Sequence, residues 1–256
     1  MLFDGLPIGT VPYLNAVPLT NGLEEPLVRL PPAQLAVEFR AGRLAAALLS
    51  VTEALMSSDD EVLDGFAIAS HGPVFSVILA HQDPLENIRE IAVDTASRTS
   101  VNLLRVLLDR WGLRPELVPL IDDVQTRKPR NLLLIGNPAI EFRRKAHPHQ
   151  VLDLGAAWWS LTGLPFVFAV WVLPHGRHGE SLRAALTASG RSGVRQLDRW
   201  SAESTGFDAA FRRRYLGGYI RYGLGALEKE GLDRFRNDLQ VLERRPLPSI
   251  RYVGTS

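Results

Sequence analysis

The 256-residue chain contains no cysteine. This absence excludes disulfide bonds, thiolate catalysis, cysteine-ligated metal sites and a lipoprotein anchor cysteine. The chain also has little excess charge of either sign. Its net charge is +1 at pH 7, so no surface suited to nucleic acid is predicted. The densest basic run, residues 212–214, is typical of a solvated helix face.

Long hydrophobic runs are missing as well. The longest, Leu164 to Leu173, contains a proline and is too short to span a bilayer. Residues 1–5 show no basic segment followed by an apolar run, so no signal peptide is predicted and a cytoplasmic location is expected. Hydrophobic residues make up 46% of the chain, which is typical of globular proteins. The length of 256 residues suffices for one large or two small domains.

Residues 91–108 predict a buried strand, a hydroxyl-rich turn and a helix. The strand residues 91–93 are apolar and partly β-branched, and the helix carries an apolar stripe at Val101, Leu104, Leu107 and Leu108. Three hydroxyl residues coincide with the first helical turn, where N–H groups have no partner in the helix: Ser97, Thr99 and Ser100. They either cap the helix or, together with Arg98, bind a carboxylate or phosphate.

Strands and helices alternate along the chain, which predicts an α/β fold with a mostly parallel sheet. Strands are expected over residues 7–11, 27–30, 44–49, 66–70, 75–80, 91–93, 117–120, 132–135 and 166–172. Helices dominate after residue 174, over 179–189, 192–201, 208–215 and 224–237, while 122–130 read as loop or helix. Four strands are followed by small polar residues, namely Asn15, Ser50, Ser97 and Asn137. Such residues predict a ligand held at the carboxyl ends of the strands.

Several segments, taken in their order and spacing, resemble the chorismate dehydratase family (MqnA) of the futalosine route to menaquinone. The matching segments cover nearly the whole chain: 11–19, 68–70, 72–77, 92–94, 97–101, 133–136, 152–155 with Trp158, 162–171, 220–222 and 231–232. The resemblance implies an α/β fold like that of type II periplasmic binding proteins, with two lobes and a cleft between them. It assigns residues 1–80 and 172–256 to lobe one and residues 81–171 to lobe two.

The family's reaction removes water from chorismate and leaves 3-[(1-carboxyvinyl)oxy]benzoate. The resemblance implies Asn15 as the catalytic residue beside the reacting ring or its hydroxyl group. It implies a substrate-binding set made of Tyr13, Ser50, Ser76, Ser97, Arg98, Thr99, Ser100 and Asn137. No side chain identifies itself as the general base, and a substrate carboxylate has the reach and basicity to take the proton. Helix N-termini and hydroxyl groups suit such a reaction, so no metal and no cofactor are expected.

The expected partner is a small molecule, chorismate, with no nucleic acid and no membrane, and the chain is expected to be a monomer or homodimer. Two features depart from the family pattern. Asn137 stands where an acidic residue often follows Ile-Gly, and Thr52-Glu53 replace the usual Glu-Tyr after Ser50-Val51. The histidine pairs 147/149 and 175/178 lie in loops without a third ligand, which argues against a metal site.

Three other functions fit parts of the pattern. The sister enzyme that makes 1,4-dihydroxy-6-naphthoate shares the fold, but segments 13–15 and 97–100 fit the dehydratase better. A solute-binding protein of a transporter, or another non-catalytic protein that binds small carboxylates, would share the fold too, although no signal peptide is predicted. A ligand-sensing domain of a regulator is disfavoured because no helix-turn-helix segment or basic face is evident.

Overall fold

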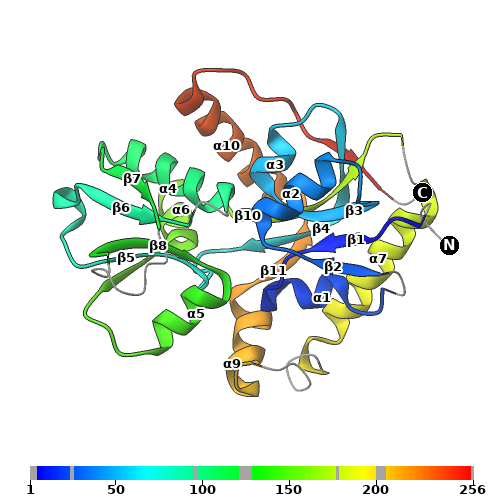
Figure 1. The fold of residues 1–256 in the computed structure, drawn as a ribbon, viewed down its shortest axis with the longest axis horizontal. Helices are drawn as coiled ribbons and strands as arrows, with labels where there is room; N and C mark the ends of the chain where they lie inside the picture. Colours follow the sequence, from blue (N-terminus) through cyan, green and yellow to red (C-terminus); the bar gives the residue numbers. More distant parts are fainter. Residues whose placement is uncertain are drawn as a thin grey trace.

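A computed structural model describes residues 5–23, 26–94, 97–120, 129–176, 179–199 and 206–254. These residues form two β-sheets, each covered by helices on both faces, at opposite ends of an elongated molecule (Figure 1). We call the half built on the seven-stranded sheet the larger lobe and the half built on the five-stranded sheet the smaller lobe. Within the described parts of the chain, no helix combines the length and apolar character that crossing a membrane requires.

The sheet of the larger lobe has the order β11-β4-β10-β3-β1-β2, and β12 also pairs with β4. Its strands β1, β2 and β3 are parallel, whereas β10 runs antiparallel to β3 and β4. The strands span Ile8–Thr10 (β1), Leu27–Arg29 (β2), Ala46–Ser50 (β3), Asp60–Ser70 (β4), Phe166–Pro174 (β10), Arg221–Leu224 (β11) and Arg251–Val253 (β12).

The sheet of the smaller lobe has the order β7-β6-β8-β5-β9. Strands β6, β7 and β8 are parallel, and β5 runs antiparallel to β8 and β9. These strands span Val77–His81 (β5), Glu90–Val93 (β6), Glu116–Pro119 (β7), Asn131–Ile135 (β8) and Gln150–Asp153 (β9).

The chain crosses between the sheets twice. It leaves β4 at Ser70 and enters β5 at Val77, and it returns before β10 begins at Phe166. Strand β5 of the smaller sheet already begins at Val77, and all of β10, from Phe166, pairs within the larger sheet. The chain therefore passes from one sheet to the other a few residues before positions 81 and 171. The division into lobes at those two positions stays a prediction, while the two crossings give the chain its two-lobed form.

The helices begin and end largely where the sequence predicts, since apolar stripes and turn residues mark their limits. They span Leu14–Ala16 (η2), Val17–Thr20 (α1), Pro32–Arg40 (α2), Val51–Leu55 (α3), Leu85–Asn87 (η3), Arg98–Arg110 (α4), Gly136–Arg144 (α5), Leu154–Thr162 (α6), Glu180–Arg195 (α7), Ala209–Arg214 (α9), Tyr215–Tyr219 (η4, a π-helix) and Ala226–Glu243 (α10). Helix α7 runs on to Arg195, where a break and a second helix over 192–201 are predicted from the sequence. Residues 200–205 and most of the predicted loop 122–130 lie outside the described residues.

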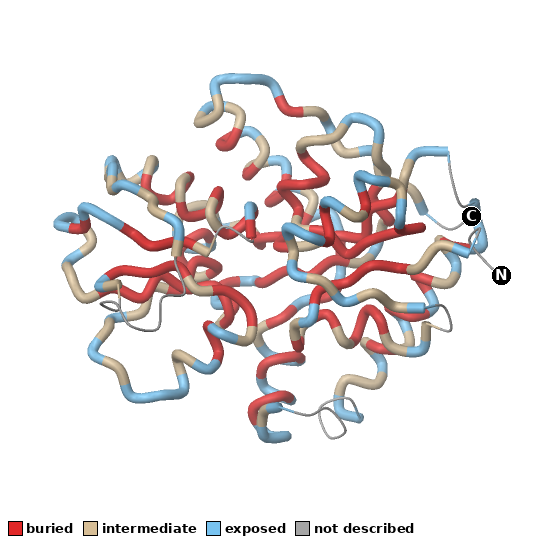
Figure 2. Tube along the Cα trace, in the orientation of Figure 1, coloured by how far each residue is buried: buried red, intermediate tan, exposed pale blue. Residues whose placement is uncertain are grey.

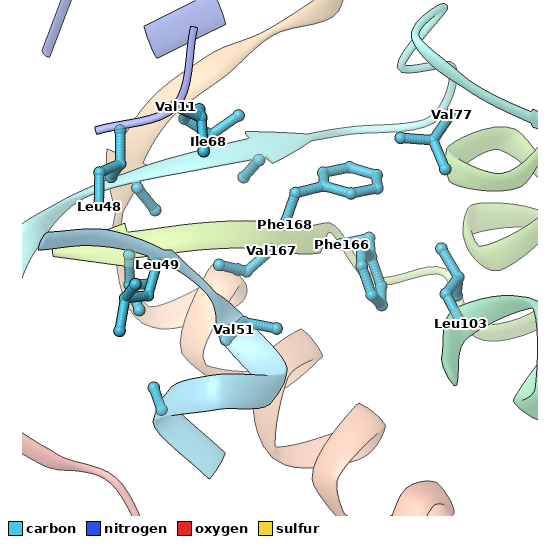
Figure 3. Close-up of a cluster of buried hydrophobic side chains, with 14 of the residues drawn as sticks. Val11, Leu48, Leu49, Val51, Ile68, Val77, Leu103, Phe166, Val167 and Phe168 are labelled. Carbon is cyan, nitrogen blue, oxygen red and sulfur yellow. The ribbon is translucent and has the colours of Figure 1, made fainter. Parts of the chain in front are cut away.

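One hydrophobic core runs through both lobes. Buried chain follows the strands, whereas exposed chain lies on the outer helices and turns (Figure 2). Phe166 and Phe168 of β10 extend toward Val77 and Leu103 of the smaller lobe (Figure 3). An ion pair also links the lobes, because Glu243 of α10 lies 2.5 Å from Arg105 of α4. The lobes are therefore packed against each other around a shared apolar centre.

The sequence predicts that Trp158, Trp159 and Trp171 are core or hinge residues. Trp158 and Trp171 are fully buried, as predicted, and the Trp158 indole donates to the Pro165 carbonyl at the second crossing. Trp159 differs, because it is 40% exposed and stacks on His71 with ring centroids 5.9 Å apart. Successive helix positions point about 100° apart, so only one of two adjacent tryptophans faces the core.

Candidate functional site

A cavity lies where the two lobes meet, and the carboxyl ends of several strands open onto it. Its volume is about 70 Å³. The larger lobe contributes residues that follow β1, end β3 and lie in β4 and β10. The smaller lobe contributes the start of α4 and the junction of β8 with α5. The lining comprises Val11, Tyr13, Asn15, Pro32, Leu48, Ser50, Ile68, Val74, Ser76, Val77, Ser97, Thr99, Ser100, Ile135, Gly136, Phe168 and Ala169.

Seven of the nine site residues predicted from the sequence line this cavity: Tyr13, Asn15, Ser50, Ser76, Ser97, Thr99 and Ser100. They come from both lobes and are drawn together from positions up to 87 residues apart in the sequence. Arg98 and Asn137 are not among the lining residues. The cavity brings seven of the nine residues together, and the role of each residue stays a prediction.

Two serines stand at the starts of the helices that meet at the cavity. Ser50 precedes α3 and Ser97 precedes α4, and neither side chain makes a capping hydrogen bond to its helix. Ser97 instead donates to the Ser100 Oγ at 3.1 Å. Among the described residues, the Ser50 hydroxyl group and the proton of the Ser100 hydroxyl group are therefore left for a ligand at helix ends that carry partial positive charge. No lysine or arginine is among the described lining residues, so an anion here would rely on neutral donors.

Thr99 uses its hydroxyl group within the protein. Its Oγ1 accepts the N–H of Thr52 at 2.9 Å and donates to the Thr52 Oγ1 at 3.0 Å. Both residues are almost fully buried. The contact joins the first turn of α3 to the first turn of α4, so Thr99 holds the two lobes together beside the cavity.

Arg98 points away from the cavity toward α3. Its guanidinium lies 3.0 Å from a carboxylate oxygen of Glu53, and Arg40 lies 2.7 Å from the other oxygen. The two residues that depart from the family pattern, Thr52 and Glu53, are thus the partners of Thr99 and Arg98. In this chain the departure supplies contacts between the lobes.

Asn137 lies in the first turn of α5 and faces the segment after β1. Its Oδ1 accepts the N–H of Leu14 at 3.3 Å. Gly136, just before it, has φ +62 and lies against the Tyr13 ring, where a Cβ atom would meet ring carbons at 2.8 Å. The departure at Asn137 therefore lies at a junction between the lobes, and glycine allows Tyr13 to approach closely. Burial and, to a lesser extent, the Asp94 charge raise the pKa of Tyr13, which keeps its phenol protonated.

Ser76 is held in place by Tyr215, a buried residue that the sequence reasoning missed. The Tyr215 hydroxyl donates to the Ser76 Oγ at 2.7 Å. Burial raises the pKa of Tyr215 well above its ordinary value, although the hydrogen bond with Ser76 acts in the opposite direction. The one sequence feature that could have drawn attention to Tyr215 is Gly217-Gly218, which lies between two tyrosines and interrupts a helical pattern.

The backbone that carries Ser76 is held in an uncommon conformation. Phe75 has a backbone φ of +69, a value that residues other than glycine adopt rarely. Its N–H donates to Asp153 at 2.8 Å, and the N–H of Val74 donates to the other carboxylate oxygen at 3.0 Å. Arg143 pairs with Asp153 at 3.1 Å and lies 4.1 Å from the centroid of the Phe75 ring. These contacts at the first crossing fix the direction in which Ser76 points.

Among the described residues, no three histidine, aspartate or glutamate side chains gather in a way that could hold a metal ion. His147 and His149 have ring centroids 5.9 Å apart, and both pack on Phe142. His175 lies 2.7 Å from Glu61, and His178 lies outside the described residues. The expectation that the chain needs no metal or cofactor stays a prediction.

Comparisons with solved structures show the fold. A protein of Archaeoglobus fulgidus superposes with a TM-score of 0.71 at 15% identity, over 93% of this chain and 97% of that one. A Candida albicans protein described as having the generic periplasmic binding protein fold matches with a TM-score of 0.63 at 10% identity, over 93% and 90%. The aliphatic sulphonate binding protein of Escherichia coli matches at 0.59 and 17% identity, over 91% and 92%. The predicted two-lobed fold is confirmed.

Comparisons of sequence show the family. A chorismate dehydratase of Thermus thermophilus is 30% identical to this chain over 264 aligned positions, which cover 91% of this chain and 94% of that protein. A family model described as menaquinone biosynthesis matches residues 6–240. The resemblance noted in the sequence is therefore confirmed, and the chain belongs to the menaquinone biosynthesis family.

Proposed function

We propose that this protein is a hydro-lyase that removes water from chorismate and releases 3-[(1-carboxyvinyl)oxy]benzoate. The observation that carries the proposal is the cavity between the lobes, which Asn15, Ser76, Ser97 and Ser100 all line. The similarity to the Thermus thermophilus chorismate dehydratase supports the same substrate.

The binding of chorismate requires groups for two carboxylates. Ser100 accepts the Ser97 hydroxyl proton and keeps its own, so Ser100 suits one carboxylate together with the N–H groups that start α4. Hydroxyl groups and helix N-termini stabilise negative charge without a cation. Ser50 at the start of α3 offers a further donor from the larger lobe. The apolar side of the cavity, with Ile68 and Phe168, suits the ring and excludes water.

The reaction needs little help from charged side chains. The ring proton is acidic through its vinylogous link to the ring carboxylate, and loss of water makes the ring aromatic. We assign the removal of that proton to a substrate carboxylate, because proton transfer requires only reach and a matched pKa. The proton and the ring hydroxyl leave together as water. Asn15 then has the role of holding the hydroxyl group in the orientation that its departure requires.

The test is to incubate the purified protein with chorismate and to follow aromatic absorbance and product mass. The expected product has the mass of chorismate less water. Asn15→Ala should abolish most of the turnover, and Asn237→Ala on the exposed side of α10 is the matched control. Chorismate that binds and is recovered intact would favour a binding protein. Turnover of a cyclic futalosine instead would favour the sister dihydroxynaphthoate-forming activity.

A further inference from the structure

A second pocket opens between the lobes, apart from the cavity described above. Its volume is about 260 Å³, and it shares none of its described lining residues with that cavity. Helix α4 of the smaller lobe forms one wall through Arg98, Val101, Asn102 and Arg105. These residues are spaced three, four and seven positions from the first, so they lie on one face of the helix. The proposed reaction gives this pocket no role.

The larger lobe forms the opposite wall. Met56, which follows α3, and Glu243 and Arg245 at the end of α10 line the pocket there. The Arg245 guanidinium donates to the Met56 sulfur and pairs with no carboxylate among the residues that the structure describes. A thioether is a weak acceptor, so most of the hydrogen-bonding capacity of Arg245 is left for a ligand.

The pocket carries an excess of positive charge. Three arginines line it against one glutamate, Glu243, which pairs with Arg105 at 2.5 Å. Glu53 pairs with Arg98 from outside the lining and is shared with one further arginine. Four arginines thus meet two carboxylates. Two positive charges at this junction therefore have no carboxylate within the described part of the chain.

Asn102 adds a buried neutral donor. The residue is only 8% exposed, and its Oδ1 accepts a hydrogen bond from Arg105 at 2.9 Å. A guanidinium can only donate, so this contact fixes the amide with its oxygen toward Arg105. The NH₂ group of Asn102 has no acceptor in the described ranges, although the residue lines the pocket. Donors from both lobes therefore face the pocket, with Glu243 as its one carboxylate.

We propose that this pocket binds the phosphate or carboxylate group of a small organic anion. Both groups offer several acceptor oxygens and no obligatory donor, and guanidinium groups bind them well. Met56 and Val101 supply apolar contacts for the rest of such a molecule. The ligand would contact Asn102 of one lobe and Arg245 of the other, so its binding would hold the lobes together at a site separate from the cavity.

Calorimetry with phenyl phosphate and, separately, phenylacetate tests the proposal at constant ionic strength. The compound that binds more tightly identifies the preferred anionic group. We expect the Kd to rise about tenfold in Arg245→Gln, since a hydrogen bond to a charged group is lost. Arg244→Gln is the matched control and should stay within about twofold of wild type. Arg244 is also exposed and removes the same charge from the end of α10, but it does not line the pocket.

The variant Ser100→Ala separates the pocket from the cavity, which the proposed function also makes an anion site. Binding that depends on Arg245 should persist in Ser100→Ala with the affinity of wild type. Binding lost in Ser100→Ala and unchanged in Arg245→Gln would place the anion in the cavity and overturn the proposal. Equal weakening in Arg245→Gln and Arg244→Gln would indicate diffuse attraction to a basic surface and would overturn it too, as would no binding of either compound.

The side-chain amide of Asn102 reports on the pocket directly. Its NMR resonance, assigned by its disappearance in Asn102→Asp, should shift as phenyl phosphate is added to the wild-type protein and to Arg244→Gln. The shift should be much smaller at the same concentration in Arg245→Gln. A resonance that stays in place while calorimetry shows binding would rule out this pocket. None of these measurements uses chorismate, so a failure of the proposed function leaves their outcome unaffected.

Discussion

Arg98 of α4 and Glu53 of α3 form an ion pair across the junction of the two lobes, with the guanidinium and carboxylate 3.0 Å apart. The Glu53 side chain is only 5% exposed, and Arg40 pairs with its second oxygen. The adjacent Thr52–Thr99 hydrogen bonds join the same two helix starts. The arginine expected to bind a ligand carboxylate is thus paired with a carboxylate of the protein itself.

Glu53→Gln should weaken this junction. Glutamine is uncharged and has one acceptor oxygen, so it can accept a hydrogen bond from Arg40 or from Arg98 but not from both through separate oxygens. The other arginine then faces the NH₂ group of the buried amide. We expect the free energy of unfolding in urea to fall by about 1–2 kcal/mol, since both arginines still reach water. Glu38→Gln, which removes the surface partner of Arg43, is the control and should leave the urea midpoint unchanged. Equal midpoints for both variants would contradict a stabilising role for the junction.

Asp153→Asn should release the first crossing between the lobes. One carboxylate oxygen of Asp153 accepts the N–H groups of Val74, Gly155 and Ala156, and the other accepts from Phe75 and Arg143. An amide cannot satisfy both sets, because its NH₂ group would face donors. We expect a loss of about 2–4 kcal/mol in urea unfolding, together with lower kcat as Ser76 loses its orientation.

Asp208→Asn is the matched control for that change. Asp208 also caps a helix, with its Oδ1 accepting the N–H of Phe211, and also pairs with an arginine. Within the described parts of the chain it has no hydrogen bond to the crossing, and asparagine caps helices as well as aspartate does. Its kcat should match that of wild type. A normal kcat in Asp153→Asn would show that Ser76 is oriented by other contacts.

Gly136→Ala should impair the site through Tyr13. The added Cβ would lie 2.8 Å from the Tyr13 ring and would force the ring into the cavity or away from it. Gly163→Ala is the control, because Gly163 has φ +69 and nothing lies within 4 Å of its Cβ position. Both variants should lose about 1–2 kcal/mol from the left-handed backbone, but only Gly136→Ala should raise KM or lower kcat. Equal kinetics would mean that Tyr13 is not needed for turnover.

Local pattern predicted much of this molecule. The stripe over residues 101–108 predicted α4, and Ser97, Thr99 and Ser100 lie at its start beside the cavity, as the hydroxyl-rich turn indicated. Strand β4 is longer than predicted, since its polar first half, from Asp60, is paired with β10 and β12 rather than marked by apolar residues. Pairing partners distant in the sequence cannot be inferred from local periodicity.

The hydrogen-bond and ion-pair partners of the site side chains could not be predicted from the sequence either, because they lie far apart along the chain. Tyr215 reaches Ser76 across 139 positions, and Glu53 reaches Arg98 across 45. The hydroxyl turn indicated an anion site, but nothing in it distinguishes a ligand carboxylate from Glu53. Arg98 therefore pairs with Glu53 and is not among the lining residues of the cavity, although a guanidinium in this turn predicts a carboxylate partner.

Glu228→Gln should remove a pH-dependent part of the stability. Burial raises the pKa of Glu228, but hydrogen bonds from His71 and from the N–H groups of Glu228 and Gly225 outweigh it and leave the pKa below its usual value. The His71 Nε2 lies 2.5 Å from the carboxylate. A carboxyl group whose pKa is lowered by folding stabilises the folded state above its unfolded pKa, and this contribution disappears as pH falls through the folded value.

At pH 7 wild type should therefore exceed Glu228→Gln by about 1 kcal/mol in the free energy of unfolding in urea, with the difference shrinking below about pH 4. Glutamine retains the cap of α10 through its carbonyl oxygen, so helix loss does not confound the comparison. A difference that stayed constant from pH 7 to pH 3 would show that packing, and not the ionised carboxylate, accounts for the effect.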